Sequence, residues 1–309
     1  MSPPRTLRVG TRDSALARAQ CEAFARQLTH ATGQPVELVG IVTEGDLSTR
    51  PVTELGNTGV FVQAVRAALL AGTVDFAVHS AKDLPTLVPD GLVVAAFPAR
   101  EDARDVLVAR DGRKLRDLRP GARVGTGSPR RTGQLLALRP DLSVTGLRGN
   151  VDTRLRRVSG GDLDAVVLAY AGLLRLGRGE AATELLDPAE VLPAPAQGAL
   201  AVECRTGDAE TARLLSGLDD DATRAAVTAE RAALARLRGG CSAPVGAYAT
   251  VERGDGGGTL RLAVVVAAPD GKRLFRRTTE GSWADARALG TDLADRLIAD
   301  GAGTVLRGA

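Results

Sequence analysis

The stretch Leu7-Arg-Val-Gly-Thr-Arg-Asp-Ser14 begins with a short strand pattern, Leu7–Thr11. An amphipathic helix pattern then runs from Ser14 to Leu28. The stretch Val124-Gly-Thr-Gly-Ser128, also followed by a helix pattern, resembles the first stretch, and Leu163–Ala169 similarly resembles Val74–Ser80. These two internal sequence similarities predict two similarly built α/β domains, each a sheet with helices on both faces. Chance similarity is the alternative explanation.

The same alternation continues along the chain, with a helix pattern at 59–70 and a buried strand pattern at 199–204. Further short strands are expected at Val36–Val42, Phe76–Ser80, Leu92–Phe97, Asp105–Ala109, Arg123–Gly125, Val144–Leu147 and Ala165–Ala169. After Leu218 the order changes to a helix, three strands and a final helix, which predicts a small α+β domain. These elements are expected at Asp219–Leu237, Val245–Val251, Thr259–Ala268, Arg273–Glu280 and Trp283–Ile298, with a hairpin connection at Gly254–Gly258.

Composition indicates a soluble globular protein, because 44% of the 309 residues are hydrophobic and 25% are charged. We expect neither a membrane-spanning segment nor a signal peptide, because the chain has no long apolar stretch and Met-Ser-Pro-Pro-Arg lacks an apolar core. Three cysteines do not make a disulfide framework, so we expect a cytoplasmic protein. Because no apolar stretch is long enough to span a membrane, we expect no membrane partner. Two histidines and no paired-cysteine spacing argue against a metal site.

Positive charge is concentrated in one part of the chain. Eight arginines against two aspartates between Arg123 and Arg157 give that segment a balance of +6, whereas the whole chain carries +3. Aromatic residues make up 3%, which leaves few stacking platforms for a nucleic acid, so we expect no nucleic-acid partner.

Several arginines of this chain stand where strands end and helices begin. Ser128 and Pro129 predict a helix start, and the helix dipole there favours an anion that Arg130 and Arg131 would also attract. A solvated basic first turn is the alternative. Arg148, Arg154 and Arg175 follow other strands, and Arg12 precedes a similar helix start at Ser14. Because arginine pairs well with carboxylates, these residues predict a ligand with many negative groups.

Two further segments carry candidate chemistry. Lys82 and Asp83 follow the strand at 76–80 and are either site residues or a surface ion pair. Cys241 lies in the glycine- and proline-flanked segment 237–244, where its thiol either faces a cleft or is inert. Cys21 and Cys204 are interpreted as small buried hydrophobic residues.

Together these motifs closely resemble the porphobilinogen deaminase (hydroxymethylbilane synthase) family, in order and spacing along nearly the whole chain. They are Thr11-Arg12-x-Ser14, Val78-His-Ser-x-Lys-Asp83, Val124-Gly-Thr-x-Ser-x-Arg-Arg131, Leu147-Arg-Gly-Asn150, Gln197-Gly198 and Gly239-Gly-Cys241. The resemblance implies two periplasmic-binding-protein-like, doubly wound α/β lobes and a small C-terminal α+β domain that carries the cofactor cysteine. We expect lobe 1 at 1–98 and 199–217, lobe 2 at 99–198 and the C-terminal domain at 218–309, with crossings at 97–102 and 191–198.

The resemblance also implies a transferase with a dipyrromethane cofactor in thioether linkage to Cys241. The family condenses four porphobilinogen molecules head to tail, releases ammonia at each step, and frees the linear tetrapyrrole by hydrolysis. Loss of ammonia leaves an electron-deficient azafulvene, and the family's catalytic Asp83 could bind the pyrrole N–H, stabilise positive charge and shuttle protons. We expect a monomer that binds porphobilinogen and the growing pyrrole chain and passes its product to uroporphyrinogen-III synthase.

Carried over residue by residue, the resemblance assigns catalysis to Asp83 and Lys82. Cofactor binding falls to Cys241, Lys82, Asp83, Thr126, Ser128, Arg130, Arg131, Arg148 and Gly149, and substrate binding to Arg12, Ser14, Arg154, Arg175 and Gln197. The chain departs from the family pattern at Glu44, Glu54, Thr58 and Gly127. The alternative function is a non-catalytic two-lobed protein that binds a polycarboxylate, which would leave Cys241 without a role.

Overall fold

The computed structural model describes residues 5–41, 60–240, 242–254 and 257–307. The chain divides into two compact units, Met1–Arg100 with Ala199–Arg224, and Glu101–Gly198 with Ala225–Ala309. The chain passes between them after residue 100, inside the expected crossing at 97–102, and after residue 198, at the end of the expected crossing at 191–198. It passes between them once more after residue 224, where the sequence predicted no crossing. Because the second unit contains both the predicted lobe 2 and most of the C-terminal segment, the three-domain division stays a prediction.

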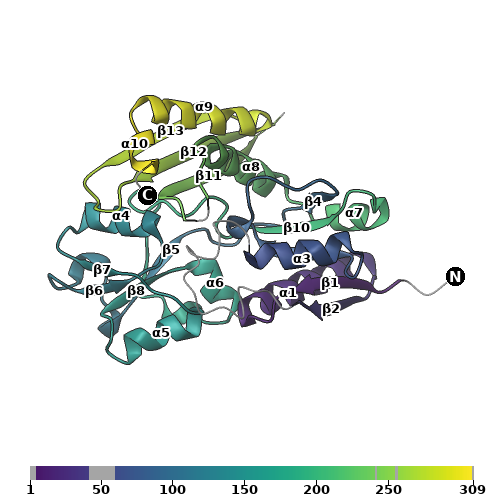
Figure 1. Ribbon diagram of the computed structural model, residues 1–309, viewed down its shortest axis with the longest axis horizontal. Coiled ribbons are helices and arrows are strands. Elements are labelled where there is room, and N and C mark those ends of the chain that lie inside the picture. Colours follow the sequence, from purple (N-terminus) through teal and green to yellow (C-terminus); the bar gives the residue numbers. More distant parts are fainter. Residues whose placement is uncertain (1–4, 42–59, 241, 255–256, 308–309) are drawn as a thin grey trace. The chain divides into compact units, whose positions relative to one another are not determined.

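The first unit is built on a five-stranded sheet in the order β2-β1-β3-β10-β4. Figure 1 labels β1, β2, β4 and β10 of this sheet. Strands β2, β1 and β3 run parallel, and β10 is antiparallel to both β3 and β4. The bounds are β1 Leu7–Thr11, β2 Val36–Gly40, β3 Phe76–Ser80, β4 Leu92–Ala96 and β10 Leu200–Arg205. Helices α1 (Ala15–Thr32) and α7 (Ala209–Ser216) share one apolar cluster with this sheet, and α3 (Val60–Leu70) shares a separate one. The sheet is therefore covered by helices on both faces, as expected.

The second unit contains a sheet of the same design, in the order β7-β6-β8-β5-β9. Its strands are β5 Asp105–Ala109, β6 Arg123–Gly125, β7 Ser143–Thr145, β8 Ala165–Ala169 and β9 Glu184–Leu185. Strands β7, β6 and β8 are parallel and β5 is antiparallel to β8, which matches the first sheet strand for strand. Alternation along β5 directs Leu107 toward α4 (Pro129–Leu138) and Val106 toward α5 (Val151–Ser159) and α6 (Tyr170–Arg175). The prediction of two similarly built α/β sheets is confirmed.

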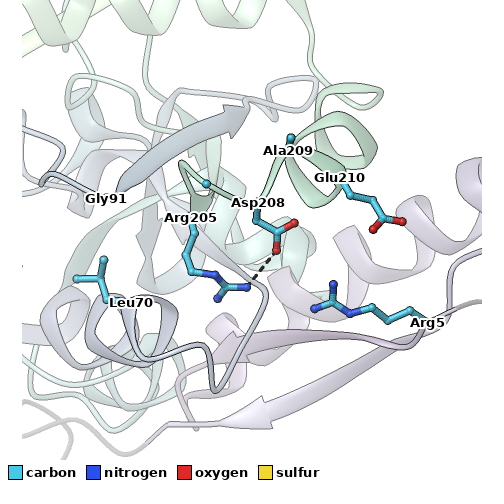
Figure 2. A pocket seen from close by; sticks show the side chains of 8 residues that line it. Arg5, Leu70, Gly91, Arg205, Asp208, Ala209 and Glu210 are labelled. Atoms are coloured by element: carbon cyan, nitrogen blue, oxygen red, sulfur yellow. Dashed lines mark hydrogen bonds and ion pairs between the residues drawn. The ribbon is translucent and has the colours of Figure 1, made fainter.

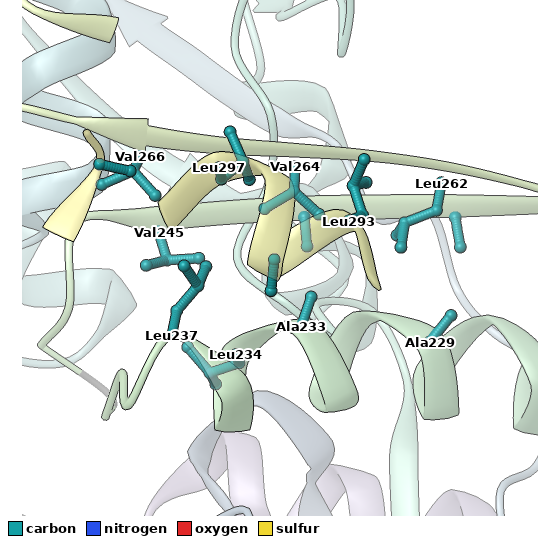
Figure 3. Close-up of a cluster of buried hydrophobic side chains, with 14 of the residues drawn as sticks. Ala229, Ala233, Leu234, Leu237, Val245, Leu262, Val264, Val266, Leu293 and Leu297 are labelled. Carbon is teal, nitrogen blue, oxygen red and sulfur yellow. The ribbon is translucent and has the colours of Figure 1, made fainter. Parts of the chain in front are cut away.

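The remainder of the second unit is a three-stranded antiparallel sheet, β11 (Val245–Gly254), β12 (Gly257–Ala267) and β13 (Leu274–Ser282). Figure 3 shows its core, where side chains of α8 (Asp221–Arg236) and α9 (Ala286–Ala299) meet valines and leucines of the sheet. At Gly290 a Cβ atom would lie 2.2 Å from the carbonyl oxygen of Ala229, so the two helices pack in backbone contact there. The α+β prediction is confirmed, although Trp283–Asp285 forms a 3-10 turn before α9 begins. The short elements are η1 Ala81–Asp83, η2 Arg110–Gly112, η3 Leu115–Asp117, η4 Gly179–Ala181 and α10 Gly303–Leu306.

Across the four described ranges, no helix is both long enough and apolar enough to cross a membrane. In the same ranges, no group of three or more His, Cys, Asp or Glu side chains is arranged to hold a metal ion.

Candidate functional site

In the first unit, the predicted site residues gather at one edge of the sheet. Because β1 and β3 are parallel neighbours, the segments that follow Thr11 and Ser80 leave the sheet at the same edge. Ser14 caps α1, its hydroxyl accepting a hydrogen bond from the Ala17 N–H at 3.3 Å, and Arg12 is half-buried. Arg12 and Ser14 therefore share this edge with Lys82 and Asp83.

Lys82 and Asp83 lie in the 3-10 turn η1, directly after β3. The Ala81 N–H donates to the carbonyl oxygen of Ala199 at 3.0 Å, and Leu84 is buried, so both ends of the turn are anchored. Asp83 is exposed and Lys82 is half-buried. An anchored turn that presents a carboxylate beside an ammonium group can bind a ligand with both N–H and carboxylate groups.

A buried ionic network lies beneath this turn, on the face of the sheet covered by α3. The Glu203 carboxylate accepts from Arg66 Nε and Nη2 at 2.9 and 2.6 Å, and its Oε2 lies 3.3 Å from His79 Nε2. Burial alone would raise the pKa of Glu203, but His79 and Arg66 lower it to about 2. This network fixes the end of β3 and was missed from the sequence, because its members are brought together only by the sheet register.

In the second unit, α4 begins as expected from Ser128 and Pro129. The Ser128 hydroxyl accepts from the Arg131 N–H at 3.4 Å, and Thr126 Oγ1 accepts from the Ser128 N–H at 3.2 Å. At the neighbouring Gly127, a Cβ atom would lie 2.7 Å from the Leu147 carbonyl oxygen, so this backbone leaves no room for the hydroxyl residue frequent in the family.

Arg130 and Arg131 are buried, at 2% and 6% exposed, so the interpretation of a solvated basic turn is wrong. Both bind Asp105, which is fully buried at the start of β5. Arg130 Nη1 donates to Oδ2 at 2.8 Å and Arg131 Nη2 donates to Oδ1 at 2.7 Å. Although burial opposes ionisation, the two guanidinium groups hold the pKa of Asp105 well below its usual value. Burial in turn lowers the pKa of Arg130.

Gln197 belongs to the same buried cluster. Its Nε2 donates to Asp105 Oδ1 at 2.7 Å and to the Ala103 carbonyl oxygen at 2.8 Å. Gly198 has a φ of +86°, and a Cβ atom there would lie 2.3 Å from the Glu101 carbonyl oxygen, so glycine is required at this crossing. A substrate-binding role for Gln197 stays a prediction.

The other arginines of the predicted site in this unit, Arg148, Arg154 and Arg175, are exposed or half-buried. Arg154 Nε donates to the Gly149 carbonyl oxygen at 2.9 Å, and Arg175 Nη2 to that of Gly198 at 2.6 Å. Burial lowers the pKa of both guanidinium groups, and the charge of Arg131 lowers that of Arg154 further. Arg148 is exposed, as is Gly149. Neutralisation by a ligand carboxylate would stabilise the half-buried cations Arg154 and Arg175.

The thiols fall into two groups. Cys21 and Cys204 are fully buried, and burial raises the pKa of each to about 11, which confirms that they are small core residues. Cys241 lies outside the described residues, as do the family departures at Glu44, Glu54 and Thr58.

A cavity of about 650 Å³ lies at the other edge of the first sheet (Figure 2). Arg5, which precedes β1, and Arg205, which ends the antiparallel β10, contribute to its lining. Arg205 donates to Asp208 at 3.0 Å there. The cavity contains none of the predicted site residues and is separate from them.

Comparison with known proteins matches two family models to the chain. Residues 7–213 match "Porphobilinogen deaminase, dipyromethane cofactor binding domain" and residues 224–299 match "Porphobilinogen deaminase, C-terminal domain". The porphobilinogen deaminase of Thermobifida fusca is 54% identical over 98% of this chain and 96% of its own length. Porphobilinogen deaminase 1 of Streptomyces coelicolor is 53% identical over 96% of each chain. A periplasmic substrate-binding protein from Coxiella burnetii, of solved structure, is 15% identical over 69% of this chain and 91% of its own, with a TM-score of 0.43.

The two family models together span nearly the whole chain, and both curated relatives match it at more than half of the aligned positions. The chain belongs to the porphobilinogen deaminase family.

Proposed function

We propose that this chain condenses four porphobilinogen molecules head to tail onto a dipyrromethane held by Cys241, releases ammonia at each step, and then frees the tetrapyrrole by hydrolysis. The observation that carries the proposal is the buried cluster at the start of α4. Arg130 and Arg131 bring two positive charges to one carboxylate, Asp105. Buried charge is stable only when it is compensated, so this cluster favours a bound anion.

The residues present fit a dipyrromethane. Each of its pyrrole rings carries an acetate and a propionate, and arginine fits planar carboxylates better than any other side chain. The residues that would hold it are Cys241, Lys82, Asp83, Thr126, Ser128, Arg130, Arg131, Arg148 and Gly149. When bound, this group supplies a covalently tethered primer whose terminal pyrrole carbon is the nucleophile.

Asp83 and Lys82 would act at the reacting centre. The exposed Asp83 carboxylate would accept a hydrogen bond from a pyrrole N–H and stabilise the positive charge that develops as ammonia leaves. Lys82 would bind a neighbouring carboxylate of the ligand. Because the turn is anchored through Ala81 and Leu84, both groups are held in place before the substrate binds.

The substrate and the growing chain would be bound by Arg12, Ser14, Arg154, Arg175 and Gln197. At the level of the whole protein we propose three domains, a monomer in the cytoplasm, and delivery of the product to uroporphyrinogen-III synthase. The identity with bacterial porphobilinogen deaminases over nearly the whole chain supports these proposals.

Incubation of the purified protein with porphobilinogen tests the function. We expect one ammonia for each porphobilinogen consumed, together with a linear tetrapyrrole seen by mass spectrometry. The alternative, a non-catalytic polycarboxylate-binding protein, would bind porphobilinogen but release no ammonia, and that result would overturn the proposal.

A further inference from the structure

Asp105 lies at the centre of the arginine cluster of the second unit and is a residue to which the sequence assigned no role. It opens β5, where the sheet pairs it with Ala169, and its side chain is fully buried. Its two oxygens accept hydrogen bonds from three side chains, those of Arg130, Arg131 and Gln197. A fully buried carboxylate with these partners is shielded by the protein and does not itself face a ligand.

Both guanidinium groups are held from a second side as well. Arg130 Nη1 also donates to the Leu192 carbonyl oxygen, and Arg131 Nη1 donates to that of Val167 at 3.0 Å. Gln134 braces Leu192, donating to its carbonyl oxygen at 3.0 Å and accepting from its N–H at 2.8 Å. Arg130 thus lies between Asp105 and the Leu192 carbonyl oxygen, and Arg131 lies between Asp105 and the Val167 carbonyl oxygen. These two-sided contacts fix the orientation of each guanidinium group.

The cluster is nevertheless incomplete. The Nε atoms of Arg130 and Arg131 are buried and make no hydrogen bond to any described part of the protein. A buried N–H without a partner carries a free-energy cost in the folded protein. This cost and the excess positive charge both indicate a preformed anion-binding site that a bound ligand completes.

We propose that Asp105 is a positioning residue for the cofactor, holding Arg130 and Arg131 in the orientation that accepts the dipyrromethane carboxylates without touching the cofactor itself. This inference rests on the proposed function. It also explains why these two arginines differ from Arg154 and Arg175, which within the described ranges bind backbone carbonyl oxygens and no buried carboxylate.

The Asp105→Asn variant separates positioning from simple charge compensation. It makes the cluster more positive, so a purely electrostatic role predicts faster or tighter binding of a carboxylate-rich cofactor. Positioning predicts the opposite, because misplacement of binding groups by about 1 Å can cost as much as a hundredfold. Asp75→Asn is the matched control, because Asp75 is fully buried, binds Arg5 at 2.6 Å and the Arg8 N–H at 2.8 Å, and lies at the other edge of the first sheet.

The measurement is the rate at which cofactor-free protein gains the dipyrromethane mass when it is supplied with porphobilinogen, with urea unfolding followed in parallel. We expect both variants to lose stability, and Asp105→Asn alone to gain the cofactor about tenfold more slowly or worse. A rate equal to that of Asp75→Asn, or a faster one, would overturn the inference. Failure of the wild-type protein to gain the mass would instead overturn the proposed function.

The Asp105→Glu variant tests the positioning role of Asp105 if Asp105→Asn does not fold. It keeps the charge and therefore the ion pairs, but the extra methylene group displaces both guanidinium groups. We expect it to fold and to gain the cofactor slowly, and a wild-type rate would contradict the positioning role.

Discussion

Asp83 is the residue to which we assign the principal catalytic role. Asp83→Asn keeps the shape of the side chain and removes its charge, so we expect a folded protein that retains the cofactor mass. Its kcat should fall by about a hundredfold or more, as is typical when one preorganised electrostatic group is removed. Steady-state kinetics of ammonia release measure this. Asp90→Asn, at an exposed aspartate of the same unit, is the control and should leave kcat unchanged. A loss of only severalfold in Asp83→Asn would show that Asp83 is not the principal catalytic group.

The two buried thiols give a second prediction at this scale. Because burial raises the pKa of Cys21 and of Cys204 to about 11, neither is a ready nucleophile at neutral pH. Cys21→Ala and Cys204→Ala should each keep the full cofactor mass and near-normal activity, with a stability loss of about 1–2 kcal/mol from the small cavity. Peptide mapping of the wild-type protein locates the adduct. An adduct on either of these cysteines would refute the assignment to Cys241.

At the scale of elements, the Glu203 network ties β10 to α3 and β3. The pKa of Glu203 in the folded protein, about 2, lies below the ordinary value of 4.5. The contribution of Glu203 to stability is therefore present above about pH 4.5 and is lost as the pH falls toward 2. The shift corresponds to about 3 kcal/mol. Urea unfolding at several pH values should show this loss, and Glu203→Gln should be less stable at neutral pH with a weaker acid dependence. Glu210→Gln, at an exposed glutamate of α7, should follow the wild-type profile. An unchanged acid profile in Glu203→Gln would contradict the assignment.

We expect the arginines to differ in role, some binding the cofactor and others the growing chain, according to the elements on which they lie. Arg130 and Arg131 are fixed in the first turn of α4, so Arg130→Leu and Arg131→Leu should lower cofactor occupancy as well as turnover. Arg12 follows β1 and Arg175 ends α6, outside the Asp105 cluster, so Arg12→Leu and Arg175→Leu should keep the cofactor and stall elongation at intermediate lengths. Mass spectrometry before and after addition of porphobilinogen measures both quantities. Equal cofactor loss in all four variants would contradict this division.

Elements with strong local signals could be predicted from the sequence. Strands β1, β3, β5, β6 and β8 begin and end at, or within one residue of, the expected positions, because each is a short apolar run bounded by helix or turn signals. The Ser128 cap and the Pro129 start of α4 were also local signals and are confirmed. Asp105 was not predicted as a partner, because Arg130 is 25 residues away and only the pairing of β5 with β8 brings the two together. A charged residue at the head of the otherwise apolar run Asp105–Ala109 was the signal that could have identified it.

At the scale of the whole molecule, the repeated sheet design follows from the repeated strand-then-helix pattern. The two sheets share strand order and direction although only short segments of their sequences resemble each other. In each sheet the candidate residues lie at the same kind of position, after the carboxyl ends of parallel strands. The fold therefore places the candidate residues at two equivalent sheet edges, one with Asp83 and Lys82 and the other with the arginine cluster.

The intact mass of the purified protein tests the central claim, a cofactor covalently bound through Cys241. The wild-type protein should exceed its polypeptide mass by one dipyrromethane, and Cys241→Ala should fold, lack this excess and release no ammonia from porphobilinogen. A wild-type protein at the bare polypeptide mass, or a Cys241→Ala variant that keeps the excess, would contradict the account.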